Sequence, residues 1–232
     1  MPTVSRGAIP TPRHILAAAM PHRVITEHPA QFLWKPAQLS MWGNSEYGDC
    51  VTAEEAFAKA CNSPEIFISD NEVIAWATAH GFLNGASLVS VLHKMRSGGF
   101  QQDAHTYNDG PCNSVDWTNA DTLQNAIFLG PVKIGIAADQ VENVYQANPR
   151  TGWVATGFQQ DSNEDHCVSL CGYGSLEWLA ENLDATIPSG VDPSLSGYAM
   201  FTWNSIGIID TPSLRAICGE AWLRNPTTVV KN

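Results

Sequence analysis

The sequence contains few charged residues, and positive charge is especially scarce. Only 15% of the 232 residues are charged, and 23 acidic side chains outnumber 12 basic ones, which gives a formal net charge of −11. Nucleic-acid binding needs clustered Lys and Arg, and no basic run occurs anywhere in the chain. We therefore expect no nucleic-acid partner. The length accommodates one large domain or two joined lobes with a sizeable core.

Long hydrophobic runs are also missing. The apolar stretch 15–20 is too short for the apolar region of a signal peptide, and it ends at Pro21. The longest later stretch, 126–138, is interrupted by glycine, proline and lysine, whereas a membrane-spanning helix needs about 20 apolar residues. These patterns predict a cytoplasmic protein without a membrane partner, and they do not indicate its oligomeric state.

Cysteine is present in moderate number, with no pattern that requires disulfides. A chain of this length does not depend on disulfides as a small secreted domain does, so we expect free thiols. His166 directly precedes Cys167, and Cys171 follows, which raises the question of a metal site. On a strand, however, His166 faces one side and the two cysteines face the other, which does not suit tetrahedral zinc. We expect neither a metal nor another cofactor.

The helical and strand-like patterns occupy different parts of the chain. Residues 1–41 are rich in proline and predict an extended arm, which we expect to pack on the strand-rich part. Residues 42–112 carry most of the helical signals, and residues 113–232 begin with one more helix and continue mainly as strands. Helices are expected to start after Asp49, Asp70, Ser87 and Asn119, and strands are expected over 132–138, 166–174, 198–207 and 222–230. This order predicts an α+β protein in which a helical lobe lies beside a β-rich lobe.

One cysteine stands where its reactivity would be raised. Cys50 opens the helix that follows Asp49, and the helix dipole and unpaired amides at such a position stabilise a thiolate. The preceding turn contains Gly43 and Gly48, which allow close approach of a ligand. A small buried apolar residue is the alternative interpretation of Cys50.

A thiol nucleophile needs a base, and the base needs an orienting group. Among the seven histidines, His166 begins a strand after a polar loop, which is a natural place for a catalytic side chain. Asn204 lies at another strand end and could hold the imidazole in one tautomer without becoming protonated. Taken alone, Asn204 is equally well explained as a turn residue.

These three residues and their surroundings resemble the papain-like cysteine peptidases. In that family a glutamine lies six residues before the nucleophile and a glycine two before it, and here Asn44 and Gly48 occupy those places. GFLNGASLVSVLHKMRSGGF resembles the family's Cys-Asn-Gly-Gly stretch and the helix after it. LQNAIFLGPVKIGIAAD resembles its helix and Gly-Pro-Val-Ser-Val strand. DHCVSLCGYG matches Asn-His-Ala-Val-x-x-Val-Gly-Tyr-Gly, and WNSIG matches Asn-Ser-Trp-Gly.

The resemblance implies a helical lobe and an antiparallel, barrel-like β lobe with the active site in the cleft between them. It implies a hydrolase that cleaves a peptide or protein substrate through an acyl-enzyme. Cys50 would be the nucleophile, His166 the acid and base, and Asn204 the residue that orients the imidazole. Asn44 would complete the oxyanion hole with the backbone N–H of Cys50. The residues expected to line the substrate cleft are Gly48, Asn84, Gly85, Asp165 and Cys167.

Several positions depart from the family pattern. Asn44 is one methylene shorter than glutamine, which shortens its reach by roughly 1 Å. Ile206 stands where the family has the tryptophan that shields the histidine–asparagine hydrogen bond. Tyr47 and Leu83 occupy the places of its paired cysteines, so the family disulfide cannot form. The arm does not resemble an inhibitory prodomain.

Two other functions therefore stay open. A papain-fold binding or structural protein with a weak or inactive centre is one, and the altered oxyanion residue favours it, whereas the intact set of Cys50, His166 and Asn204 disfavours it. An acyl transferase that resembles transglutaminases is the other, because it shares the first half-reaction with hydrolysis.

Overall fold

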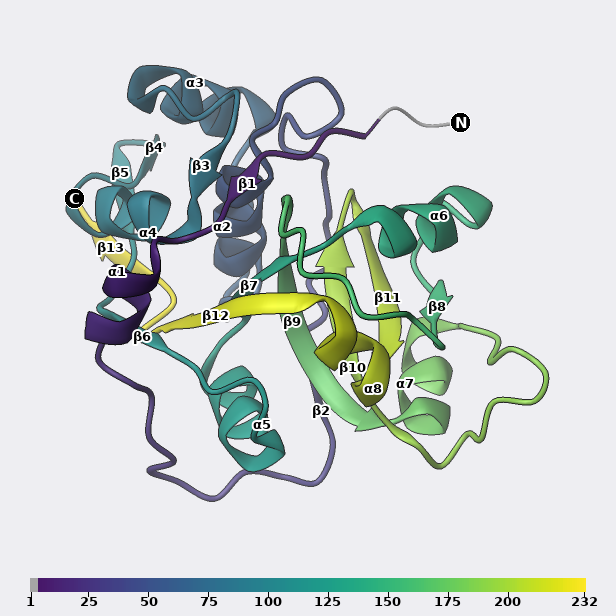
Figure 1. Ribbon diagram of the computed structural model, residues 1–232. Coiled ribbons are helices and arrows are strands. Elements are labelled where there is room, and N and C mark those ends of the chain that lie inside the picture. Colours follow the sequence, from purple (N-terminus) through teal and green to yellow (C-terminus); the bar gives the residue numbers. More distant parts are fainter. Residues whose placement is uncertain (1–3) are drawn as a thin grey trace.

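The computed structural model describes residues 4–232 and places most of the helices of the first half apart from a large sheet (Figure 1). The helices are α1 (Arg13–Ala18), α2 (Cys50–Ala60), α3 (Asp70–His80), α4 (Leu88–Ser97), α5 (Ala120–Leu129), α6 (Asp139–Ala147), α7 (Leu176–Leu183) and α8 (Thr211–Ile217). The strands are β1 (Ala8–Ile9), β2 (Phe32–Leu33), β3 (Ala86–Ser87), β4 (Phe100–Gln102), β5 (His105–Asn108), β6 (Cys112–Ser114), β7 (Val132–Ile136), β8 (Val154–Ala155), β9 (His166–Ser175), β10 (Ser196–Thr202), β11 (Ser205–Asp210), β12 (Cys218–Arg224) and β13 (Val229–Lys231). The α+β prediction is confirmed.

The predicted helix starts are reproduced, except that α3 begins one residue earlier than expected, at Asp70. Ser87 and Asn119 cap α4 and α5 by accepting the backbone N–H three residues on, as capping side chains do. At α3 the cap is Ser69, which accepts from Glu72, and Asp70 is the first helical residue. Asp49 occupies the cap position of α2 but makes no capping hydrogen bond.

The β lobe is built on an eight-stranded sheet in the order β6-β12-β7-β9-β10-β11-β8, with β2 added against β9. The sheet stays open, so the expected barrel-like closure is not present among the described residues. Strand β9 lies near its centre and buries side chains on both faces, as a central strand must. Cys167 packs toward α2 and the helical lobe, whereas Val168 and Leu170 pack toward α5 on the other face.

The segment 198–207, which the sequence predicts as one strand, is a hairpin. Strand β10 ends at Thr202 and β11 starts at Ser205, so Trp203 and Asn204 form a two-residue turn. Both turn residues have positive φ, 45° for Trp203 and 58° for Asn204. Such turns need left-handed backbone at both central positions, which asparagine tolerates well.

The proline-rich arm does not form a separate unit, because its short strands pair with strands of both lobes. Strand β1 pairs in parallel with β3 of the helical lobe, and β2 pairs with β9 of the large sheet. In Figure 1 the purple N-terminal segment passes beside β3 before it enters α1. The division into an arm, residues 42–112 and residues 113–232 stays a prediction, and residues 1–3 of that arm lie outside the described part of the chain.

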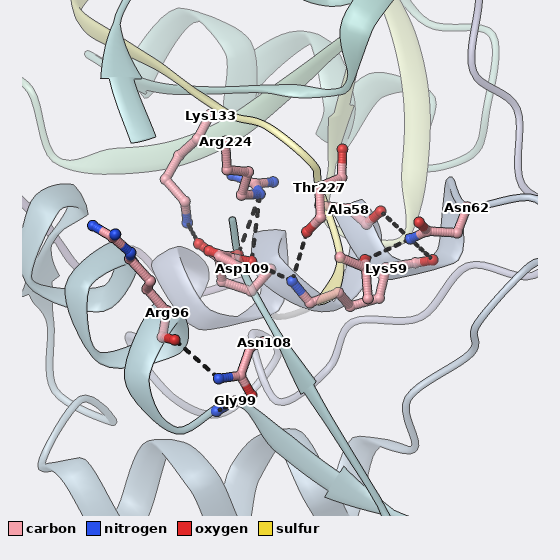
Figure 2. Close-up of polar contacts among 12 residues, drawn as sticks. Ala58, Lys59, Asn62, Arg96, Gly99, Asn108, Asp109, Lys133, Arg224 and Thr227 are labelled. Carbon is pink, nitrogen blue, oxygen red and sulfur yellow. Dashed lines mark hydrogen bonds and ion pairs between the residues drawn. The ribbon is translucent and has the colours of Figure 1, made fainter. Parts of the chain in front are cut away.

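A fully buried network of charges fixes α2 to the sheet. Lys133 Nζ on β7 lies 2.7 Å from Glu54 Oε2 and 2.8 Å from Glu55 Oε1, and both carboxylates also pair with Arg224 on β12. Lys59, further along α2, contacts Asp109 in the same network, as Figure 2 shows. Because removing one partner of a buried pair leaves an uncompensated charge, this network holds the helix in a defined position.

The six cysteines, Cys50, Cys61, Cys112, Cys167, Cys171 and Cys218, are all free thiols, as expected. Within residues 4–232, no helix combines the length and the apolar character needed to cross a membrane.

Candidate active site

The first turn of α2 meets the start of β9, and this contact brings Cys50 close to the backbone of the residue after His166. Cys50 Sγ accepts the N–H of Cys167 at 3.4 Å, and the N–H of Gly7 also faces the sulfur. Cys50 is 2% exposed. Burial raises the pKa of its thiol to about 12, so Cys50 is a neutral thiol in this arrangement.

The imidazole of His166 is held on one side and unpaired on the other. Its Nε2 lies 2.8 Å from Thr202 Oγ1, and its ring stacks on Trp203 with centroids 4.4 Å apart and planes inclined by 19°. Its buried Nδ1 has no hydrogen-bond partner among residues 4–232. Burial, reinforced by the positive charge of Arg6, lowers the pKa of His166 to about 3. The imidazole is therefore neutral as well.

The orienting role of Asn204 stays a prediction, and the described geometry differs from the contact that it implies. Neither ring nitrogen of His166 bonds to Asn204, whose side chain is exposed in the β10–β11 turn. The hairpin register explains the difference, because strand pairing ends at Thr202 and places Asn204 beyond the sheet. Thr202 is the residue that His166 Nε2 contacts in place of Asn204. An indole also covers the imidazole, and it belongs to Trp203, three residues before Ile206.

Asn44, the expected oxyanion donor, is buried beside the arm. Its Nδ2 donates to the carbonyl oxygens of Ser5 and Tyr47, each at 3.0 Å. Trp203 Nε1 donates to the same Ser5 oxygen at 3.2 Å. Two side-chain donors thus converge on one backbone carbonyl of the arm. The oxyanion role of Asn44 stays a prediction.

The arm packs closely against the backbone around Cys50. Gly7 lies so close to Gly48 that a Cβ on Gly7 would come within 1.8 Å of the Gly48 oxygen. The Gly7 carbonyl accepts the N–H of Ala86 at 2.9 Å, and a Cβ on Gly85 would come within 2.8 Å of the same oxygen. Gly48 and Gly85, predicted to line the substrate cleft, therefore both contact the arm through close backbone approach.

Asp165 binds the arm with its backbone and its side chain. Its carbonyl accepts the N–H of Ala8 at 3.0 Å, and its Oδ2 lies 2.7 Å from Nη1 of Arg6. Cys167 is buried and offers its N–H to Cys50. Asn84 is exposed next to Gly85. Whether these residues contact a substrate stays a prediction for all of them.

The acidic residue before Cys50 holds its proton to a higher pH than an ordinary aspartate. Burial, reinforced by the nearby Asp70, raises the pKa of Asp49 to about 8. Burial is also the largest cause of the raised pKa of Cys50, and Asp49 adds to it, whereas Glu46 is exposed to solvent.

Four residues of this site were not predicted from the sequence: Arg6, Gly7, Thr202 and Trp203. A hairpin turn at Trp203 and Asn204 could have been inferred from the tolerance of asparagine for left-handed backbone, and it would have moved the orienting role to Thr202. Arg6 and Gly7 carry no local signal, because their contacts are with residues more than 35 positions away.

No family model and no curated protein matches this sequence. Solved structures do match. The ragweed pollen allergen Amb a 11, a cysteine protease in its proform, aligns over 96% of this chain and 74% of its own, with a TM-score of 0.64 and 13% identity. Xylellain, a cysteine protease from Xylella fastidiosa, aligns over 96% of both chains, with a TM-score of 0.63 and 14% identity. A Carica candamarcensis cysteine protease in complex with E-64 covers 85% of this chain at a TM-score of 0.56 and 15% identity. The chain has the fold of the papain-like cysteine proteases.

Proposed function

We propose that this protein is a papain-like thiol hydrolase that cleaves peptide or amide bonds of a peptide or protein substrate through Cys50 and His166. The main support is the state of His166. Thr202 binds Nε2, while the buried Nδ1 has no hydrogen-bond partner among the described residues, and the residue after His166 donates its N–H to Cys50 Sγ. A buried nitrogen without a hydrogen-bond partner destabilises the fold, which is unfavourable if its role is purely structural. A general base, in contrast, needs a nitrogen with a free lone pair.

In the proposed reaction, Thr202 Oγ1 accepts a hydrogen bond from the Nε2–H of His166. The lone pair on Nδ1 is then free to take the proton from Cys50. Sγ attacks the substrate carbonyl carbon, and the carbonyl π electrons move to the oxygen. The backbone N–H of Cys50 and the amide of Asn44 stabilise that oxyanion. His166 then gives its proton to the leaving amine as the C–N bond breaks. Finally, His166 deprotonates a water that hydrolyses the thioester and restores the thiol.

This reaction requires the arm to leave the cleft. Gly7 and Ser5 occupy the space next to Cys50 and Asn44, and their backbone groups use the donors that a substrate would need. Departure of the arm also admits water, which removes part of the burial that holds the thiol and imidazole in their neutral forms. We propose that the described arrangement is a closed form of the enzyme.

A binding protein with an inactive centre is the second candidate, favoured by one observation. Thiol and imidazole are both neutral, with pKa values of about 12 and 3, whereas an activated thiolate needs a depressed thiol pKa.

Hydrolysis of an unstructured polypeptide separates the two candidates. Gly7→Val places a side chain against Gly48 and should displace the arm, so that this variant degrades the polypeptide faster than the unmodified chain. Cys50→Ala in the same background should abolish cleavage. Cys61→Ala, which removes a buried thiol at the other end of α2, is the matched control and should retain activity.

Cleavage that survives Cys50→Ala would overturn the proposed function. Absence of cleavage in a folded Gly7→Val protein, checked by circular dichroism, would favour the binding protein. Adding a primary amine distinguishes transfer from hydrolysis, because a transferase would incorporate the amine into the product.

A further inference from the structure

Three carboxylates from two segments surround the guanidinium of Arg6. Glu142 Oε2 accepts from Nη2 at 2.5 Å and from Nε at 2.9 Å, Asp165 Oδ2 lies 2.7 Å from Nη1, and Asp139 contacts Nη1 as well. We call Asp139, Glu142 and Asp165 the carboxylate cage. Asp139 and Glu142 are one turn apart in the first turns of α6, where the helix dipole favours negative charge.

The carboxylate cage lies directly beside the reacting position. Arg6 immediately precedes Gly7, whose N–H faces Cys50 Sγ, and Asp165 immediately precedes His166. Ala8, on the other side of Gly7, pairs with β3. Arg6 therefore lies on the side of the cleft that α6 borders. A cavity of about 710 Å³ borders the arm next to Arg6, and its lining includes Ser5, Tyr145 of α6 and Trp203.

The charges of the carboxylate cage are matched to a cation. Arg6 is the only charged residue of the arm segment 4–9, and its side chain is 24% exposed. The three carboxylates raise the pKa of Arg6 although burial opposes its charge. When the arm leaves, the three carboxylates lose their cation, although Asp165 Oδ1 still accepts the N–H of Ala138 at 3.0 Å. Like charges at this range repel. Another cation is then favoured at the same place.

We propose that the carboxylate cage is a specificity pocket for an arginine or lysine side chain of the substrate, located at the residue that flanks the scissile bond on the α6 side. Arg6 is the intramolecular occupant of this pocket in the closed form. Of the two cationic side chains, arginine fits better, because its planar group offers several N–H donors to several carboxylates at once. The proposal rests on the proposed hydrolase function and specifies its substrate class.

The test uses the full-length chain with Arg6→Ala and Gly7→Val combined, which vacates the carboxylate cage and displaces the arm. A mixture of unstructured peptides is digested and the cut sites are mapped by mass spectrometry. We expect arginine and lysine to be enriched at one position flanking the cut, by roughly ten- to a hundredfold over glutamine, as hydrogen bonds between charged groups provide. Adding Glu142→Gln should remove most of this enrichment while cutting continues. Adding Glu181→Gln, a matched substitution at an exposed position of α7, should leave it unchanged.

Measuring peptide binding to the same variant tests the specificity pocket even if the protein shows no cleavage activity. The peptide Val-Ser-Arg-Gly-Ala-Ile, which copies residues 4–9, should bind at least tenfold more tightly in calorimetry than its citrulline counterpart, and Glu142→Gln should abolish the difference. Cutting without any enrichment, or equal binding of the two peptides, would overturn the specificity pocket and leave the proposed hydrolase intact. Absence of cutting together with selective binding of the arginine peptide would instead overturn the hydrolase and retain a cation-binding pocket.

Discussion

At the residue scale, the hydroxyl of Thr202 holds the imidazole of His166, and Asn204, two residues further on, does not. Thr202 is buried and lies 2.8 Å from His166 Nε2, whereas Asn204 is exposed at the turn. An imidazole whose Nε2 proton has no acceptor loses its fixed tautomer and leaves a buried polar atom unpaired.

Substituting these two residues tests the assignment. In the arm-displaced Gly7→Val background, Thr202→Val removes the hydroxyl at nearly constant volume and should lower kcat/KM roughly 10- to 100-fold, which corresponds to about 1–3 kcal/mol. Thr202→Ser should restore most of the activity. Asn204→Ala should change kcat/KM less than threefold. The opposite ranking, with Asn204→Ala the more damaging substitution, would return the orienting role to Asn204.

A second residue-scale feature is a carboxyl pair below the arm. Glu220 accepts from the N–H of Thr11 at 2.9 Å and from Trp222 Nε1 at 2.5 Å. Burial and the neighbouring Glu220 raise the pKa of Glu164 to about 9. Glu164 is therefore protonated at neutral pH and donates its proton within the pair.

This pair predicts a loss of stability with rising pH. A carboxyl that binds its proton more tightly in the folded state stabilises the fold below its ordinary pKa of 4.5, and this contribution is lost as the pH rises toward about 9. Urea unfolding between pH 5 and 9 should therefore show a falling free energy of unfolding, with a shallower fall in Glu164→Gln. Glu181→Gln should follow the unmodified protein. Identical slopes for Glu164→Gln and the unmodified protein would contradict the shared proton.

At the element scale, helix α2 carries Cys50, the proposed nucleophile, at one end and a buried charge network along its length. Lys133 Nζ also donates to the carbonyl of Val51 at 2.7 Å, so the network reaches the first turn next to Cys50. Glu54 and Glu55 are almost completely buried, and no solvent is available to stabilise them if a cation is lost.

Lys133→Met should therefore destabilise the fold by about 3–5 kcal/mol, because Glu54 and Glu55 lose a buried partner. Chemical denaturation measures this loss. Lys94→Met, the same substitution at an exposed position of α4, should stay within about 0.5 kcal/mol of the unmodified protein. A decrease in the free energy of unfolding of less than 1 kcal/mol for Lys133→Met would show that the network does not fix the position of α2.

Most elements near the nucleophile can be predicted from the sequence, since their signals are local. Ser87 and Asn119 act as caps, and glycine ends the helices that they open. The hairpin at Trp203 was missed, because its residues read as a continuous strand and only tertiary pairing fixes the turn. Helix α6, with Asp139 and Glu142, was missed because its sequence is mostly polar, and its position depends on packing of Val141 and Tyr145 against the sheet.

At the scale of the whole molecule, we propose that the arm closes the active site. It pairs with β3, approaches Gly48 closely and places Arg6 in the carboxylate cage, so three different interactions hold the six residues 4–9 in place. The sequence predicted the α+β fold, which the chain shares with papain-like cysteine proteases (Figure 1), and the two lobes with a shared cleft stay a prediction. It could not predict what occupies the cleft, because contacts between residues 5–9 and positions 44–165 depend on the completed fold.

The rate at which a thiol-directed epoxide modifies Cys50 tests the central claim most directly, when it is measured by mass spectrometry from pH 5 to 9. In the unmodified chain the thiol pKa of about 12 and the arm should keep this rate low. Arg6→Glu repels the carboxylate cage, and Gly7→Val clashes with Gly48, so either variant should raise the rate at Cys50 at least tenfold below pH 7 and leave the other five cysteines unchanged. Equal labelling of all six cysteines, or a rate at Cys50 that neither arm variant changes, would contradict a catalytic thiol closed by its own N-terminal arm.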